Sequence, residues 1–134
     1  SVSETRIMFS LPRVSGSANR AVGLFSQSGN FKGHVDDGSA GKFPKKSVTD
    51  SFASSFHHYA VRFDGSAVSL HIDGQPVDSR SVNLSDLKAT DTIRIGAVGN
   101  APGSGADMVA DGFRLYDGSL SDAQINQIYL NTEP

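Results

Sequence analysis

The sequence predicts an all-β sandwich with one short helix near the C-terminus. In several short runs along the chain every second residue is apolar, as expected of half-buried strands. Stretches rich in Gly, Asp and Ser separate these runs, and every acidic residue except Glu4 and Glu133 is Asp, which favours turns over helices. Helical spacing occurs only once, close to the C-terminus. A chain of 134 residues without an internal repeat fits a single domain.

Three strands are predicted in the first part of the chain. Residues 7–11 have apolar side chains at every second position. Residues 20–27 are apolar on both parities, which is typical of a strand covered on both faces. Residues 30–36 alternate again and follow a Ser28-Gly29-Asn30 turn, so we expect them to form a hairpin with the preceding strand.

A long segment without periodicity follows these strands. From Asp37 to Asp50 the chain consists mainly of Gly, Lys, Ser and Pro, with only Phe43 and Val48 as large apolar residues. This composition predicts a surface loop, and long surface loops often carry binding residues.

The clearest hairpin runs from His57 to Asp73. Two alternating runs flank a turn at residues 64–67, and the length of that turn sets the register. The predicted apolar pairs, which we expect to be buried together, are Phe63 with Val68, Val61 with Leu70 and Tyr59 with Ile72. On the polar face the same register places His58 opposite Asp73 and Ala60 opposite His71.

The last part of the chain predicts two strands and the helix. Residues 93–98 and 108–116 have strand patterns and are separated by a loop rich in Gly, at residues 99–107. In the second strand Asp111 has the parity of apolar neighbours, so we expect its carboxylate to point inward. Ser121 with Gln124 three residues later forms a capping box, and an apolar stripe then continues to Asn131.

Composition excludes several function classes. Without cysteine the chain has no disulfide and no thiolate chemistry. A net charge of −2 and a sequence pI near 6.0 do not favour nucleic acid as a partner. No apolar run is long enough to predict insertion into a membrane.

Four segments in order resemble a known family. They read FHHYAVRFDG at residues 56–65, VSLHIDG at 68–74, IRIG at 93–96 and DGFRLYDGSLSDAQI at 111–125. Together they are similar to laminin G-like jelly-roll domains of the concanavalin A-like lectin/glucanase superfamily. The resemblance implies an all-β, two-sheet antiparallel jelly-roll sandwich over residues 1–134. The family's opening strand has no counterpart here, which leaves open whether this domain lacks it.

The resemblance also bears on activity. Family members most often bind carbohydrate or protein, and the hydrolases of this fold use an ExDxxE motif on one strand. Since the two Glu residues are Glu4 and Glu133, that motif is absent, and we expect no enzymatic activity.

Candidate ligand-binding residues are concentrated in the loop at 37–50. One aromatic ring among ammonium groups suits an anionic glycan or an acidic protein surface. Two residues elsewhere add an exposed ring and a loop amide. The predicted set is Lys42, Phe43, Lys45, Lys46, Asn100 and Tyr116. The alternative is a solvated loop with the Phe43 ring tucked onto the sandwich.

Two kinds of metal site are considered. Calcium prefers hard oxygen ligands, and loop position makes the candidates Asp36, Asp37, Asn100 and Asp107. The alternative is that these residues form turns through their own backbone bonds. A second hypothesis is a transition-metal site at His58, His71 and Asp73. Its alternative is that the two histidines form hydrogen bonds to neighbouring strands.

The sequence leaves two functional interpretations. The first is a non-catalytic binding or adhesion module that recognises carbohydrate on a cell surface or matrix. The second is a structural protein-interaction domain, such as a virion decoration or fibre component, within a homo-oligomer or a larger assembly. Either predicts an extracellular, cell-surface or virion location.

Overall fold

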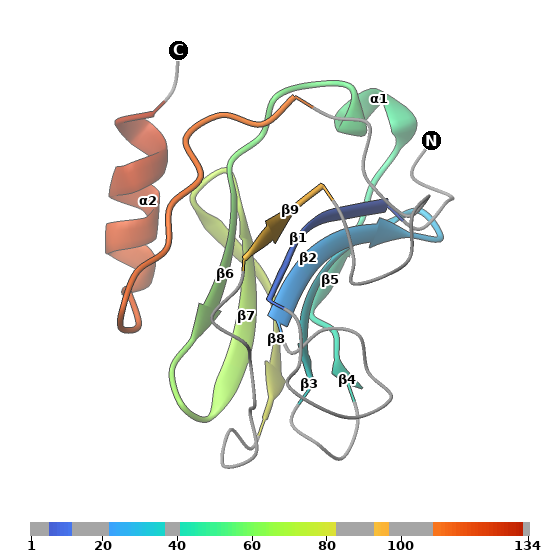
Figure 1. Ribbon diagram of the computed structural model, residues 1–134. Helices are drawn as coiled ribbons and strands as arrows, with labels where there is room; N and C mark the ends of the chain where they lie inside the picture. Colours follow the sequence, from blue (N-terminus) through green and yellow to red (C-terminus); the bar gives the residue numbers. More distant parts are fainter. Residues whose placement is uncertain (1–5, 12–21, 37–40, 83–92, 97–108, 133–134) are drawn as a thin grey trace.

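The computed structural model describes residues 6–11, 22–36, 41–82, 93–96 and 109–132, which form two antiparallel sheets and two helices (Figure 1). The first sheet has the order β4-β3-β2-β1-β9, with β5 also paired to β3, and the second has the order β6-β7-β8. The strands are β1 (Arg6–Leu11), β2 (Val22–Gln27), β3 (Asn30–Asp36), β4 (Gly41–Lys42), β5 (Lys45–Ser47), β6 (Tyr59–Phe63), β7 (Ala67–Ile72), β8 (Gln75–Ser81) and β9 (Arg94–Ile95). The helices are α1 (Asp50–Ala53) and α2 (Asp122–Leu130).

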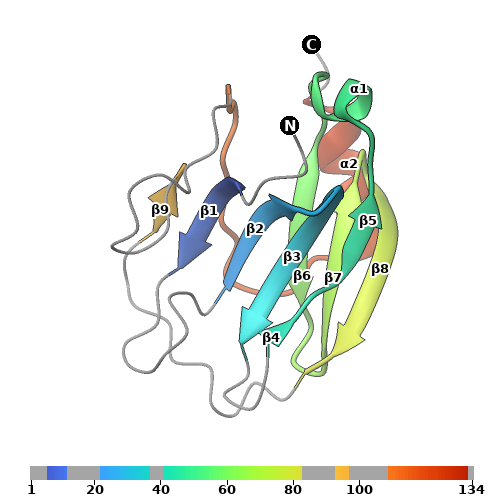
Figure 2. The same cartoon turned by 90° about the vertical axis from the view of Figure 1, so that its right-hand side faces the viewer.

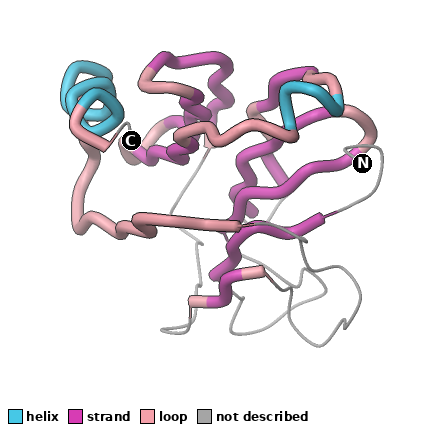
Figure 3. Tube along the Cα trace, turned by 90° about the horizontal axis from the view of Figure 1, so that it is seen from above, coloured by secondary structure: helices cyan, strands magenta, loops and turns pink. Residues whose placement is uncertain are grey.

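The molecule is layered, with α2 beside the three-stranded sheet and the six-stranded sheet on the other side (Figures 1 and 3). The core fills the space between the sheets. Its largest cluster comprises Leu24 and Phe31 from the six-stranded sheet and Leu70 and Ile72 from β7. A second cluster joins Val35, Val68 and Val82. The chain therefore forms the predicted two-sheet sandwich with a C-terminal helix.

The predicted β6–β7 hairpin has the predicted register: Phe63 pairs with Val68, Val61 with Leu70 and Tyr59 with Ile72. The three β7 residues are buried, whereas the three β6 residues are half-buried and pack against the core clusters. This difference arises because β6 is the outermost strand of its sheet among the described residues, whereas β7 has a neighbour on each side.

The prediction of an unbroken loop at 37–50 is wrong. The segment contains β4 and β5, both paired with β3, and α1 begins at Asp50. A further backbone bond joins the Gly33 N–H to the Pro44 carbonyl at 2.9 Å. The strands were missed because they are short and lie at an edge, where backbone pairing needs no apolar pattern.

The predicted strand at 108–116 is also wrong over the residues that the structure describes. Val109–Tyr116 has no strand structure, and its side chains, including Asp111, are exposed. Gly112 has a φ of 65°, in the left-handed region, which interrupts an extended backbone. The Phe113 ring still packs edge-on against Phe9, with the centroids 5.6 Å apart.

The C-terminal helix agrees with its predicted signals. The Ser121 side chain accepts a bond from the Gln124 backbone N–H, and the Gln124 side chain accepts one from the Ser121 N–H. Ile125 is the buried residue of the apolar stripe. The helix packs so closely on the β7–β8 turn that a Cβ at Gly74 would lie 3.0 Å from the Cα of Asn126.

Candidate functional site

Strand β5 divides the predicted basic cluster between two faces of the sheet. Lys45 pairs with Lys32, on the outer face that is turned away from the three-stranded sheet. Lys46 pairs with Phe31, a residue of the inter-sheet core. Because side chains alternate along a strand, Lys45 and Lys46 point to opposite faces. The same alternation places Phe43 with Lys45, and Lys42 with Lys46.

The Phe43 ring lies on the outer face. It stacks on the His34 ring at a centroid distance of 4.8 Å and an angle of 12°, and it meets the Phe25 ring edge-on at 6.0 Å. His34 and Phe25 are buried, whereas Phe43 is 39% exposed. The ring is therefore held against the sheet, as in the prediction of a ring tucked onto the sandwich. It still offers a substantial surface to solvent, as a binding residue requires.

Polar groups lie on the same face of the sheet as this ring. The Lys32 ammonium lies 5.9 Å from the centroid of the Phe25 ring and donates a 2.9 Å hydrogen bond to the Gln27 amide oxygen. Farther along the face, the Ser47 hydroxyl donates to the Asn30 amide oxygen at 2.9 Å. Ammonium, amide and hydroxyl groups are the types that bind the hydroxyl and acidic groups of sugars.

A carboxylate from the other sheet fixes the position of β5. The Asp78 carboxylate of β8 accepts a 2.9 Å bond from the Lys45 backbone N–H and a 2.9 Å bond from the Arg80 guanidinium. Figure 2 shows β5 and β8 side by side along this edge. Sequence reasoning missed Lys32, His34 and Asp78. The first two lie on the polar parity of the predicted 30–36 strand, which was a usable signal, whereas Asp78 acts across 33 residues and gave none.

Other predicted ligand and calcium residues are not brought to this face. Tyr116 is 45% exposed and lies three residues after Phe113, whose ring packs on Phe9 of β1, two strands away from β3. Asp36 is the last residue of β3, and its backbone pairs with Gly41. Asp37, Asn100 and Asp107 lie outside the described residues.

The structure does not support the hypothesis of a transition-metal site at His58, His71 and Asp73. The Asp73 carboxylate accepts bonds from His57 Nδ1, at 2.8 Å, and from the His58 backbone N–H, at 3.0 Å. The His71 ring is instead fully buried, with Nε2 3.8 Å from an Asp122 carboxylate oxygen of α2. Within the described ranges, His, Asp and Glu side chains form no cluster of three that could hold a metal.

Burial changes the acid–base behaviour of this region. It lowers the pKa of His58, and it lowers the pKa of His71, where the nearby Arg62 guanidinium adds to the effect. Arg62 itself forms an ion pair with Asp122. The face that the sequence predicted to be polar is thus the surface on which α2 docks.

Comparison with known proteins gives a family and several structural neighbours. A family model described as the concanavalin A-like lectin/glucanases superfamily, of the laminin G type, matches residues 1–126. No curated protein sequence matches the chain. Among the described residues, no helix is both long and apolar enough to cross a membrane.

The structural neighbours are distant in sequence. The receptor binding domain of botulinum neurotoxin C/D mosaic serotype matches with a TM-score of 0.71 and 16% identity, over 97% of this chain and 32% of that one. Domains LG4-5 of the mouse laminin alpha1 chain match with a TM-score of 0.58 and 15% identity, over 79% of this chain and 28% of that one. An S-layer domain-containing protein from Clostridium thermocellum matches with a TM-score of 0.50 and 21% identity, over 95% and 64%. The chain thus spans about a third of the neurotoxin domain, and these likenesses concern the fold.

Proposed function

The chain belongs to the concanavalin A-like lectin/glucanases superfamily, and on that premise we propose that it is a non-catalytic module that binds carbohydrate on a cell surface or matrix. The superfamily name covers lectins and glucanases, so the choice between them depends on this chain's residues. Glycoside hydrolysis requires a pair of carboxyl groups flanking the scissile bond. Both Glu residues stand near the ends of the chain, without the strand motif of the hydrolases, and this favours binding over catalysis.

The outer face around Phe43 is the proposed binding surface. The observation that carries the proposal is a partly exposed aromatic ring, stacked on a buried histidine, on the same face as Lys32 and Lys45. A ring held in place can stack on the apolar face of a pyranose without losing side-chain freedom. The two ammonium groups favour a sugar that carries carboxylate or sulfate.

An extracellular location accords with this proposal. One structural neighbour is described as a receptor binding domain and another consists of laminin domains. These descriptions belong to those proteins, and they support the proposal by showing which tasks the fold performs elsewhere.

Glycan-array binding with two matched pairs of variants tests the proposal. Phe43→Ala should abolish binding, whereas Phe56→Ala, which removes a ring that is 75% exposed elsewhere, should not. Lys45→Ala should weaken binding most at low salt, and Lys46→Ala, on the opposite face, should weaken it less. Absence of glycan binding by the unmodified protein, or equal losses within each pair, would argue against this surface.

One observation favours a second candidate, a structural protein-interaction domain. Val109 is 80% exposed, Leu115 64% and Ile95 54%, all in segments at or following the β9 edge. Large exposed apolar side chains are typical of surfaces that contact another protein. Assembly into a defined symmetric oligomer without sugar affinity, measured by light scattering and glycan array, would favour this candidate over the first.

A further inference from the structure

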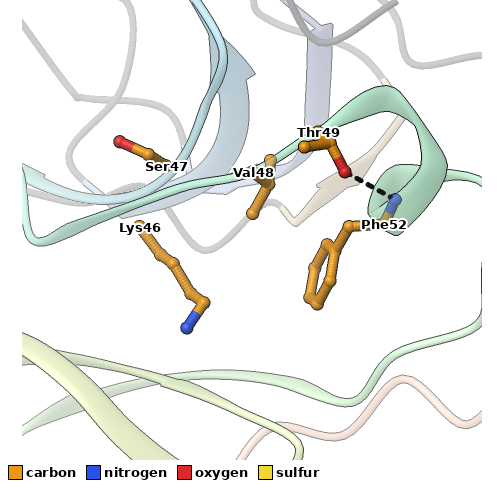
Figure 4. Close-up of a pocket in the computed structure, with 5 residues that line it drawn as sticks. All are labelled: Lys46, Ser47, Val48, Thr49 and Phe52. Carbon is orange, nitrogen blue, oxygen red and sulfur yellow. Dashed lines mark hydrogen bonds between the residues drawn. The ribbon is translucent and has the colours of Figure 1, made fainter.

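A hollow lies beside β5, on the face opposite to Lys45 (Figure 4). Its volume is about 350 Å³, and its lining residues are Lys46, Ser47, Val48, Thr49 and Phe52. Small-molecule sites begin at about this size, so the hollow has room for a ligand built on a single ring.

The aromatic wall of the hollow is held firmly. The Phe52 ring stacks on the His57 ring, with centroids 3.7 Å apart at an angle of 11°. His57 bonds the Asp73 carboxylate through Nδ1, at 2.8 Å, and the Phe52 carbonyl oxygen through Nε2, at 3.0 Å. The Phe52 N–H donates to the Thr49 hydroxyl oxygen at 3.2 Å. A ligand would therefore meet a ring that is already in position, which lowers the entropic cost of binding.

The hollow also has one cation. Figure 4 shows the Lys46 side chain extending to the same side as the Phe52 ring, while Ser47 points away from it. Ser47 is engaged with Asn30 through its hydroxyl. Lys46 is exposed, and within the part of the chain that the structure describes its ammonium has no hydrogen-bond or ion-pair partner. A single ammonium opposite an apolar wall matches a ligand with one negative charge and an apolar face.

We propose that this hollow is a second binding site, which takes a small carboxylate whose body is a single six-membered ring with an apolar face. The ring lies against Phe52 and Val48, and the carboxylate pairs with Lys46. The shared chemistry fits an aromatic acid and a uronic acid alike. The site does not depend on the outer face, because Lys45 and Lys46 belong to opposite faces of β5.

Chemical-shift perturbation in ¹H–¹⁵N spectra tests the proposal with benzoate and glucuronate as probes. Either acid should shift the amides of Val48, Thr49 and Phe52. The acid that binds more tightly shows whether the site prefers an aromatic acid or a uronic acid. Their uncharged counterparts, benzamide and glucose, should shift these amides much less at the same concentration. Shifts spread over the surface, or equal shifts from charged and uncharged probes, would overturn the proposal.

Three variants assign the interaction to Lys46 and Phe52. Lys46→Ala should weaken binding of the acid about tenfold, as expected on losing a charge-assisted contact, and Lys46→Arg should restore most of it. Lys45→Ala should have little effect, so equal losses from Lys45→Ala and Lys46→Ala would overturn the site. Phe52→Leu, checked for an unchanged melting temperature, should also weaken binding. Phe43→Ala, on the outer face, should leave acid binding intact. These results would support the second site even if no glycan binds the outer face.

Discussion

Two consecutive residues of β7, Leu70 and His71, are both fully buried although they point to opposite faces. Leu70 belongs to the inter-sheet core, and His71 faces α2 through its contact with Asp122. Among the described residues, neither ring nitrogen of His71 has a hydrogen-bond partner. Leu70 therefore stabilises the fold by packing alone. Burying the polar His71 ring costs free energy, and that cost depends on whether the ring is protonated.

Truncation of Leu70 measures the first contribution. Leu70→Ala should reduce the free energy of unfolding by about 2 to 5 kcal/mol, because the deleted side chain leaves a cavity between the two sheets. Urea denaturation gives this value. Ile95→Ala, at a residue that is 54% exposed, is the control and should change the stability by less than about 1 kcal/mol. A comparable loss in both variants would mean that Leu70 does not hold the core.

Two histidines that lie against α2, the buried His71 and the half-buried His58, make stability depend on pH. Burial lowers the pKa of His58 and His71 in the folded state below the ordinary 6.5, so the unfolded chain binds more protons as the pH falls. Stability from these groups is fully present above pH 6.5 and is lost as the pH falls below it. The melting temperature should therefore drop between about pH 7.5 and pH 5. His71→Asn should flatten this dependence, and an unchanged slope would exclude His71 as its source.

At the scale of elements, polar and aromatic contacts attach α2 to the three-stranded sheet. Asp122 pairs with Arg62 of β6, and Asn126 accepts a 3.3 Å bond from the Gln75 side chain at the start of β8. The Tyr129 ring lies 6.1 Å from the His58 ring. The β7–β8 turn passes directly beneath the helix at Gly74, so this turn controls how closely α2 can approach.

A pair of glycine variants isolates the approach of α2. Gly74 and Gly29 have nearly the same φ, 74° and 72°, so alanine should cause similar backbone strain at each, about 1 kcal/mol. At Gly74 the added Cβ would also lie 2.5 Å from the Asn126 side-chain oxygen and 3.0 Å from the Tyr129 ring, whereas at Gly29 it meets nothing within 4 Å. Gly74→Ala should therefore lower the melting temperature more and increase amide exchange in α2. Similar exchange in both variants would mean that the helix accommodates the methyl group.

At the scale of the whole molecule, the two sheets are joined by the core and by the Asp78 link along the β5–β8 edge. This link secures the strand on which both proposed surfaces depend. The loops at the ends of the strands remain the proposed place for calcium, with Asp36 at the end of β3 as its described member.

Calcium should raise the melting temperature if the loop aspartates bind it. At a hundredfold excess over the dissociation constant, the added stability is about 2.7 kcal/mol. Magnesium is the control ion, and Asp117→Asn, at an exposed aspartate after the 109–116 segment, is a control for Asp36→Asn. A melting curve that a chelator leaves unchanged in a calcium-saturated sample would remove the hypothesis.

Short sequence patterns were sufficient to predict the β6–β7 hairpin and the helix α2. The β6–β7 register followed from a short turn between two alternating runs, and α2 followed from its capping box. Strands β4 and β5 were not predictable, because pairing with β3 positions them and their residues lack a strand pattern. Residues 109–116 show the reverse case: their pattern alternates, but the segment pairs with none of the described strands and Gly112 turns its backbone.

The candidate site was predictable in composition and not in arrangement. Lys42, Phe43, Lys45 and Lys46 were identified as a cluster because a loop was expected to present them together. The strand geometry of β5 divides them instead, and His34 and Lys32 from β3 complete the outer face.

The alternation in β5 restricts how the length of the preceding segment can vary. If inserting or deleting one residue between Lys42 and Lys45 shifts the register of β5 on β3 by one residue, Lys45 and Lys46 exchange faces. A different residue then donates its backbone N–H to Asp78. A change of two residues would preserve both faces. We therefore expect length variation at this point among homologous sequences to occur in even steps, with odd steps accompanied by loss of one lysine or the other.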